Sequence, residues 1–205
     1  MKTVEIIGYQ RANLGKSEAK QLRAEGNVPC VLYGGKEQTH FHAPMILFRD
    51  VIYTPEARFV ELNIEGKKVK AILQDAQFHP VSEVILHADF LELFDDKPVQ
   101  MDIPVKTVGN APGVQNGGKL IMKQTHLKVK SIPASMPDFI EVDINDLKLG
   151  KTKKVGELPT GDYEIQNSSL VTICSVEVPR AMRGKSGDEE EGEEEEAAAA
   201  EGGEG

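Results

Sequence analysis

Short runs in which apolar and polar residues alternate recur along most of this chain, and they constrain its fold more than any other feature. One example is the run VILHADFLE, residues 84–92, and another is FVELNI, residues 59–64. A period of two residues is that of a half-buried β-strand, whereas an amphipathic helix needs a period near 3.6. Clusters of Gly, Pro and Asn separate the runs, as turns require. The chain is therefore predicted to be mainly β.

Residues 1–94 are predicted to form a β-barrel domain with two short helices, because strands dominate without a repeating strand–helix–strand order. The first helix is expected from about Ser17 to Glu25, with Ser17 as its N-cap and Gly26 as its C-terminal stop.

The second helix is expected within residues 43–55, with Pro44 in its first turn and Pro55 at its exit. The segment EGKK, residues 65–68, lies between two alternating runs and predicts the turn of a hairpin.

The rest of the chain has a different texture. Residues 95–183 contain further alternating or β-branched runs and almost no helical periodicity, so a second all-β domain is expected there. Residues 184–205 are predicted to be a disordered acidic tail, because they hold little apolar surface to bury and their charges repel.

The net charge of −9 is localised. Residues 188–205 hold ten of the 33 acidic residues and no basic one, which leaves 24 basic and 23 acidic residues elsewhere. No apolar run of 18 residues exists, so no membrane span is expected, and the N-terminus lacks the apolar centre of a signal peptide. Cys30 and Cys174 lack any motif spacing and are expected to be buried thiols in a cytoplasmic protein.

His87 and Asp89 are two ionisable residues within an apolar strand. Alternation places them on one face with Ile85 and Leu91, while Leu86, Ala88 and Phe90 face the core. From the residues alone the pair could be catalytic, could hold a metal, could contact another molecule, or could have no role.

An enzyme and a metal site are both disfavoured. No G-x-S-x-G motif accompanies the pair, and His40 and His42, which form a second His-x-His pair, follow no zinc spacing. Two near-matches to a phosphate loop, residues 113–120 and 149–152, are interpreted as ordinary turns. No catalytic residue, metal, cofactor or small-molecule substrate is therefore predicted.

A stripe of cations follows the first helix. Lys16, Lys20 and Arg23 are spaced to share one helical face, and Arg11 lies in the loop before it. Residues 9–36 hold five basic and two acidic residues. Such a stripe suits a phosphate backbone, but charge alone favours a solvated helix face, since three basic residues on a helix are common.

Three ordered segments add a resemblance. They are YQRANLGKSEAKQLRAEGNVPCVLYGG, QDAQFHPVSEVILHADFLEL and GGKLIMKQTHLKVKSIPASMPDFIEVDINDLKLG. In this order they resemble the bacterial large-subunit ribosomal proteins that bind 5S ribosomal RNA, in the long two-domain form known as the general stress protein Ctc type. The resemblance covers residues 1 to about 180.

The resemblance implies that the N-terminal barrel binds the loop E region of 5S ribosomal RNA on its minor-groove side. It also implies eight RNA-binding residues, which are Arg11, Lys16, Lys20, Arg23, Tyr33, Gln77, His87 and Asp89. The family usually has Arg where this chain has Lys20, so the charge is kept and the planar, bidentate fork is lost.

The expected function is thus that of a non-enzymatic component of the large ribosomal subunit, located in the cytoplasm. The expected partners are 5S ribosomal RNA and large-subunit proteins, with the chain present as a monomer within the ribosome. The alternative is a stress-related, ribosome-associated adaptor that uses its C-terminal β domain for protein contacts.

Overall fold

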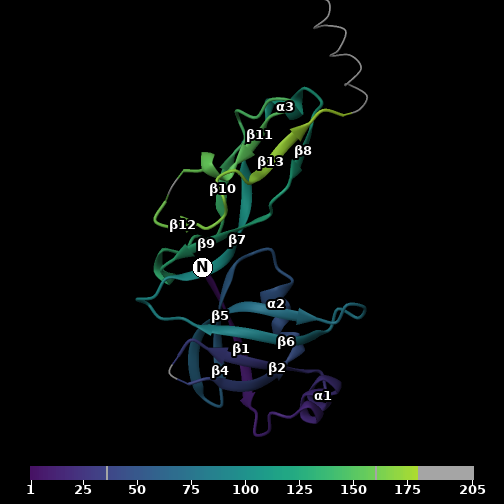
Figure 1. Cartoon of the computed structure of the whole chain (residues 1–205), viewed down its shortest axis with the longest axis vertical. Helices are drawn as coiled ribbons and strands as arrows, with labels where there is room; N and C mark the ends of the chain where they lie inside the picture. Colours follow the sequence, from purple (N-terminus) through teal and green to yellow (C-terminus); the bar gives the residue numbers. More distant parts are fainter. Residues whose placement is uncertain (36, 160, 180–205) are drawn as a thin grey trace, which may run out of the picture. The chain divides into compact units, whose positions relative to one another are not determined.

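The computed structural model describes residues 1–35, 37–159 and 161–179. It is mainly β, as predicted, and its N-terminal part is a closed six-stranded barrel (Figure 1). The strand order around the barrel is β1-β3-β2-β6-β5-β4, and the parallel pairing of β1 with β4 closes it. The strands are β1 (Lys2–Gln10), β2 (Asn27–Tyr33), β3 (Thr39–Pro44), β4 (Arg58–Ile64), β5 (Lys67–Phe78) and β6 (Ile85–Glu92).

The barrel interior is filled by alternate residues of its strands and by Phe48, which lies in the helical segment after β3. Phe41, Phe48 and Phe90 are fully buried, and the Phe90 ring lies 5.8 Å from Phe41 and 6.1 Å from Phe48, centroid to centroid. Cys30 is buried in the same core and is a free thiol. Because alternate side chains of each strand point into the core, the others point outward and can contact other molecules.

Helix α1 (Lys16–Ala24) begins earlier than predicted. Its N-cap is Gly15, which has extended backbone and no side chain to form a capping hydrogen bond, so the expectation that Ser17 is the cap is wrong. Ser17 lies in the first turn instead. The predicted stop is confirmed, because Gly26 has a φ of +81°, a conformation that glycine adopts at little cost.

The second helical segment is a 3-10 turn, η1 (Met45–Phe48), that runs into a single α-turn, α2 (Arg49–Ile52). Pro44 is the last residue of β3 and precedes this segment, so its expected place in the first helical turn is wrong. The hairpin between β4 and β5 is confirmed. Its two-residue turn is Glu65-Gly66, with φ values of +50° and +92°.

Residues from 99 onward form two further sheets, which confirms a second β domain. One has the order β10-β7-β9-β12 and the other β11-β13-β8. The strands are β7 (Val99–Val108), β8 (Lys119–Met122), β9 (His126–Ser131), β10 (Ile140–Asp143), β11 (Thr152–Lys154), β12 (Glu164–Ile165) and β13 (Thr172–Glu177). Short helical turns are α3 (Pro112–Gln115), η2 (Pro133–Ser135) and η3 (Val155–Glu157).

By internal contacts the described residues divide into two compact units. One holds residues 1–106, 126–140 and 159–167, and the other holds residues 107–125, 141–158 and those from 168. The boundaries expected after residues 94 and 183 stay predictions, and the predicted tail, 184–205, lies outside the described residues. Within the described residues, no helix is both long enough and apolar enough to span a membrane.

Candidate nucleic-acid interface

His87 and Asp89 share the outer face of β6, as alternation predicted, and each side chain is about one-third exposed. The alternation fails one residue earlier. Ile85 is fully buried in the core, and Leu86 is only partly buried, so the expected positions of these two side chains are wrong.

A bulge explains the change of phase. Gln77 on β5 lies opposite His87, but the next residue, Phe78, lies opposite Ile85, so β6 carries one extra residue, Leu86. An extra residue shifts every side chain before it to the other face. The bulge therefore sends Ile85 inward while His87 and Asp89 stay outward.

His87 and Asp89 also contact each other. Nδ1 of His87 lies 2.6 Å from Oδ1 of Asp89, an ion pair when the imidazole is protonated. Oδ1 of Asp89 is buried and accepts no hydrogen bond from the described residues. Because Oδ1 is buried against His87 while the Asp89 side chain is one-third exposed, the other carboxylate oxygen, Oδ2, is the acceptor that a bound molecule can reach.

The neighbouring strands bring further polar groups to this face. Gln77 is exposed and directly opposite His87, and Asp75 is opposite Asp89. Tyr33, at the end of β2, pairs with Leu91 of β6. Desolvation, followed by the charges of Asp89 and Asp75, raises the pKa of Tyr33, so its hydroxyl stays protonated and can donate a hydrogen bond.

Sequence reasoning missed Asp75 as a member of this group. It lies on the same strand as Gln77 and two residues before it, so strand alternation was a signal that could have placed both on one face. Its position opposite Asp89 depends on a second bulge, at Gln74, where Leu73 pairs with Phe90 and Asp75 with Asp89.

Helix α1 packs on β2 through the buried Leu22. Lys16 and Lys20 are exposed, as the spacing predicted. Arg23 is partly buried, and its Nε donates a 2.9 Å hydrogen bond to the backbone carbonyl of Leu86. The helix with the cations is thus fastened to the strand that carries His87 and Asp89.

Arg11 has a different environment from the other predicted residues. Its side chain is only 9% exposed, and Nη2 lies 3.8 Å from Oε2 of Glu18 on α1. Nε and Nη2 are buried and have no hydrogen-bond partner among the described residues. The backbone N–H of Arg11 donates to the carbonyl of His40 on β3 at 3.0 Å. Arg11 is therefore placed beside α1 and β3, and its guanidinium is not a free loop cation.

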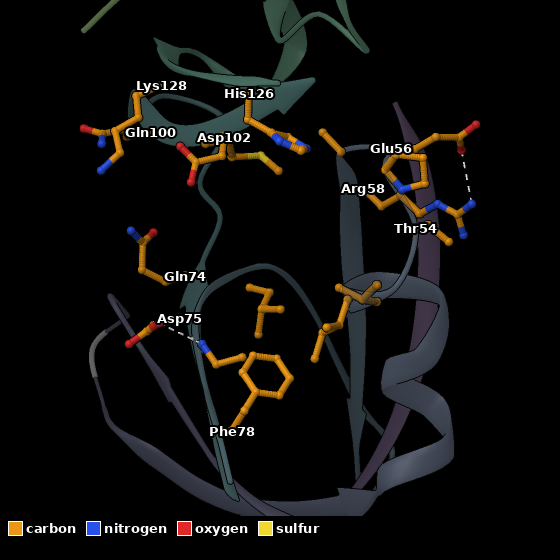
Figure 2. A pocket seen from close by; sticks show the side chains of 17 residues that line it. Thr54, Glu56, Arg58, Gln74, Asp75, Phe78, Gln100, Asp102, His126 and Lys128 are labelled. Atoms are coloured by element: carbon orange, nitrogen blue, oxygen red, sulfur yellow. Dashed lines mark hydrogen bonds and ion pairs between the residues drawn. The ribbon is translucent and has the colours of Figure 1, made fainter. Parts of the chain in front are cut away.

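A pocket of about 510 Å³ borders this group at Asp75 (Figure 2). None of the eight predicted residues lines it, and its charged residues are of both signs, with Glu56 paired to Arg58 at 3.1 Å. Within the described residues, no three His, Cys, Asp or Glu side chains lie together as metal ligands.

Comparison with known proteins identifies the chain. Residues 6–90 match the Ribosomal L25p family, and residues 98–180 match the C-terminal domain of ribosomal protein TL5. The large ribosomal subunit protein bL25 of Cytophaga hutchinsonii is 54% identical over 183 residues, which cover 89% of this chain and 95% of the relative. The bL25 protein of Amoebophilus asiaticus is 51% identical over 93% of this chain and 97% of its own length, and that of Porphyromonas gingivalis 45% over 90% and 97%.

The fold and these matches define a class, that of the bacterial large-subunit ribosomal proteins. Within it, the chain belongs to the bL25 family, in the long two-domain form that its sequence resembled. This is a family of ribosomal structural proteins and not of enzymes. The expected location, the cytoplasmic ribosome, is confirmed by the same membership.

Proposed function

We propose that the barrel binds 5S ribosomal RNA, at its loop E region, through α1 and the outer face of β2, β6 and β5. The observation that carries the proposal is the hydrogen bond from Arg23 to the carbonyl of Leu86, at 2.9 Å. It joins a helix with exposed cations to a strand with paired ionisable residues, and both kinds of group are needed for selective RNA binding.

In this proposal helix α1 and the strands make different kinds of contact with the RNA. Lys16 and Lys20 are exposed on α1 and attract phosphates, each contact releasing condensed counterions. His87, Asp89 and Gln77 lie on the strands and contact base edges or ribose hydroxyls, which is how single-stranded and irregular RNA is read. The partly exposed carboxylate of Asp89 suits a base N–H or a 2′-hydroxyl and repels a phosphate, so it adds discrimination rather than affinity.

Arg11 and Tyr33 complete the proposed site in different ways. The Tyr33 hydroxyl, kept protonated, donates to an RNA acceptor beside Asp89. The Arg11 side chain is mostly buried. Its positive charge therefore adds to the electrostatic potential around α1, and it interacts with RNA only where the RNA lies close to it.

A competition titration tests the proposal. The full chain is titrated against labelled 5S ribosomal RNA near physiological salt, about 150 mM, with transfer RNA as an unlabelled competitor. Tight binding that resists the competitor supports the proposal, and equal, weak binding of both RNAs contradicts it. Lys67→Ala is the matched control for Lys16→Ala, because Lys67 is an exposed lysine beside the β4–β5 turn, away from α1.

Contacts with other large-subunit proteins and a monomeric state within the ribosome are proposals of the same kind. The adaptor alternative stays a prediction. Ribosome co-purification that survives deletion of residues 1–94 would favour it over RNA binding by the barrel.

A further inference from the structure

The outer face of β1 and β3 carries aromatic rings that the proposed site does not use. Tyr9 is 53% exposed at the end of β1, and His40 and His42 are partly exposed on β3. Ile7, on the same face of β1, is 47% exposed. Partly exposed rings that do not pack in the barrel core provide apolar contact area for another molecule.

Tyr9 and His42 form a pair. They lie directly opposite each other in the antiparallel pairing of β1 with β3, and their ring centroids are 5.7 Å apart with 32° between the planes. Nδ1 of His42 is buried and has no hydrogen-bond partner among the described residues. Nε2 is therefore the ring nitrogen of His42 that can form a hydrogen bond with a bound molecule.

Strand register connects this pair to the proposed site. His40 on β3 lies opposite Val31 of β2, and Val31 lies opposite Asp89 of β6. Val31 is only 8% exposed, and α1 packs on β2 (Figure 1). The helix therefore separates two surfaces that lie on opposite sides of β2 in the barrel order. One carries His87 and Asp89, and the other carries Tyr9 and His42.

Local charge indicates which kind of molecule fits the second surface. Residues 9–36, which include α1 and the loop before it, hold five basic and two acidic residues, whereas the whole chain is acidic. A long polyanion that the α1 cations attract would extend past the helix onto the barrel surface on both of its sides. An aromatic ring beside a cationic element is the arrangement that stacks an RNA base while the backbone is held by phosphate contacts.

We propose that Tyr9 and His42 form a second RNA contact on the β3 side of α1. Tyr9 stacks on an unpaired base, and Nε2 of His42 contacts a phosphate or base edge of the same segment. The inference rests on the proposed function, since the RNA that α1 holds is the molecule that reaches this face. It adds residues that sequence patterns did not assign to RNA.

Five variants of the full chain, three at tyrosines and two at His42, test it by titration and by hydroxyl-radical footprinting of 5S ribosomal RNA. Tyr9→Ala removes the ring, Tyr9→Phe keeps it, and Tyr53→Ala is the matched control. Tyr53 is 60% exposed and follows α2, which is not part of the proposed RNA surface. Base–aromatic stacking is worth about a 5- to 150-fold change in affinity per base.

We expect Tyr9→Ala to weaken binding within that range and to lose protection at a few adjacent nucleotides, while the rest of the footprint remains. Tyr9→Phe and Tyr53→Ala should bind as the parent chain does. The salt dependence of Tyr9→Ala should equal that of the parent, because no phosphate contact is lost. His42→Gln, which keeps a donor, should bind more tightly than His42→Ala.

Other outcomes overturn the inference. If Tyr9→Ala binds like Tyr53→Ala with an unchanged footprint, the face does not contact RNA. If Tyr9→Ala lowers incorporation into large subunits without changing binding to isolated 5S RNA, the face contacts a protein. In both cases the parent chain still binds 5S RNA selectively, whereas failure of the parent chain itself refutes the proposed function.

Discussion

The guanidinium of Arg23 and the backbone carbonyl of Leu86 are joined by a 2.9 Å hydrogen bond, across 63 residues of sequence. Leu86 is the extra residue of the β6 bulge, and its carbonyl has turned toward α1. The bulge thus does two things, since it changes the phase of the strand before His87 and provides an acceptor for the helix. Arg23 is both a cation of the proposed surface and a positioning residue for it.

Replacing Arg23 separates these two roles. Arg23→Lys keeps the charge but cannot place the same planar N–H on Leu86, so we expect a several-fold loss of affinity for 5S RNA with an unchanged salt slope. Arg23→Ala should lose more affinity, and its salt slope should fall by about 0.7–0.9, the value for one phosphate contact. Titrations at three or more salt concentrations provide both quantities. Equal affinity of Arg23→Lys and the parent chain would show that the hydrogen bond does not position the site.

Lys16 and Asp89 are expected to act on different quantities. Lys16→Ala should reduce the salt slope of 5S RNA binding by about 0.7–0.9, because one phosphate contact is lost. Asp89→Asn should reduce the preference for 5S RNA over transfer RNA by about 1–3 kcal/mol, by analogy with a lost base-edge contact. Lys67→Ala should change neither. Identical effects of the two variants on slope and preference would contradict this division.

The strands were the part of the fold that sequence predicted well. Hydrophobic alternation reports directly which side chains are buried, and the Glu65-Gly66 turn has a strong local signature. Helix α1 was predicted from its end signals, and the stop at Gly26 was correct. Its N-cap was assigned wrongly, because Gly15 has no side chain to mark it and Ser17 is a preferred cap residue.

The site was less predictable than the fold because it depends on register. Neither bulge of the β5–β6 pair has a local signature such as a Gly, so the inward position of Ile85 could not be read from alternation. The burial of Arg11 is equally non-local, since Glu18 and β3 reach it only after the barrel closes. The outward position of His87 and Asp89 was predicted, because both lie beyond the bulge.

Phe90 is the residue whose loss should most affect the stability of the barrel. It is fully buried, it follows Asp89 in β6, and it contacts the rings of Phe41 and Phe48. Phe90→Ala should lower the free energy of unfolding by about 3–5 kcal/mol, because a large cavity is left in a closed barrel. Phe78→Ala, at a 41% exposed position on β5, is the control and should lower it by much less. Chemical denaturation measures both, and similar losses in the two variants would mean that the barrel core collapses around the cavity.

Cys30 should make the stability of the chain fall at alkaline pH. The thiol is 1% exposed, and burial, followed by the charge of Asp89, raises its pKa well above the ordinary range. A thiol in the unfolded chain loses its proton near pH 8.5, whereas the buried thiol keeps it. Above that pH the folded state therefore binds more protons than the unfolded state, and the free energy of unfolding falls as pH rises, by up to about 1.4 kcal/mol per pH unit.

The stabilising contribution of the Cys30 thiol is fully present below about pH 8 and is lost progressively above it. Cys30→Ala should therefore show a shallower decline in the free energy of unfolding between about pH 8 and 10 than the parent chain. Urea denaturation at fixed pH values measures the two slopes, in reducing buffer so that no disulfide forms. The same burial should protect Cys30 from iodoacetamide in the folded chain, since only the thiolate reacts. Rapid alkylation of Cys30 at neutral pH, or equal slopes in the two proteins, would show that the thiol is not held in a closed barrel core.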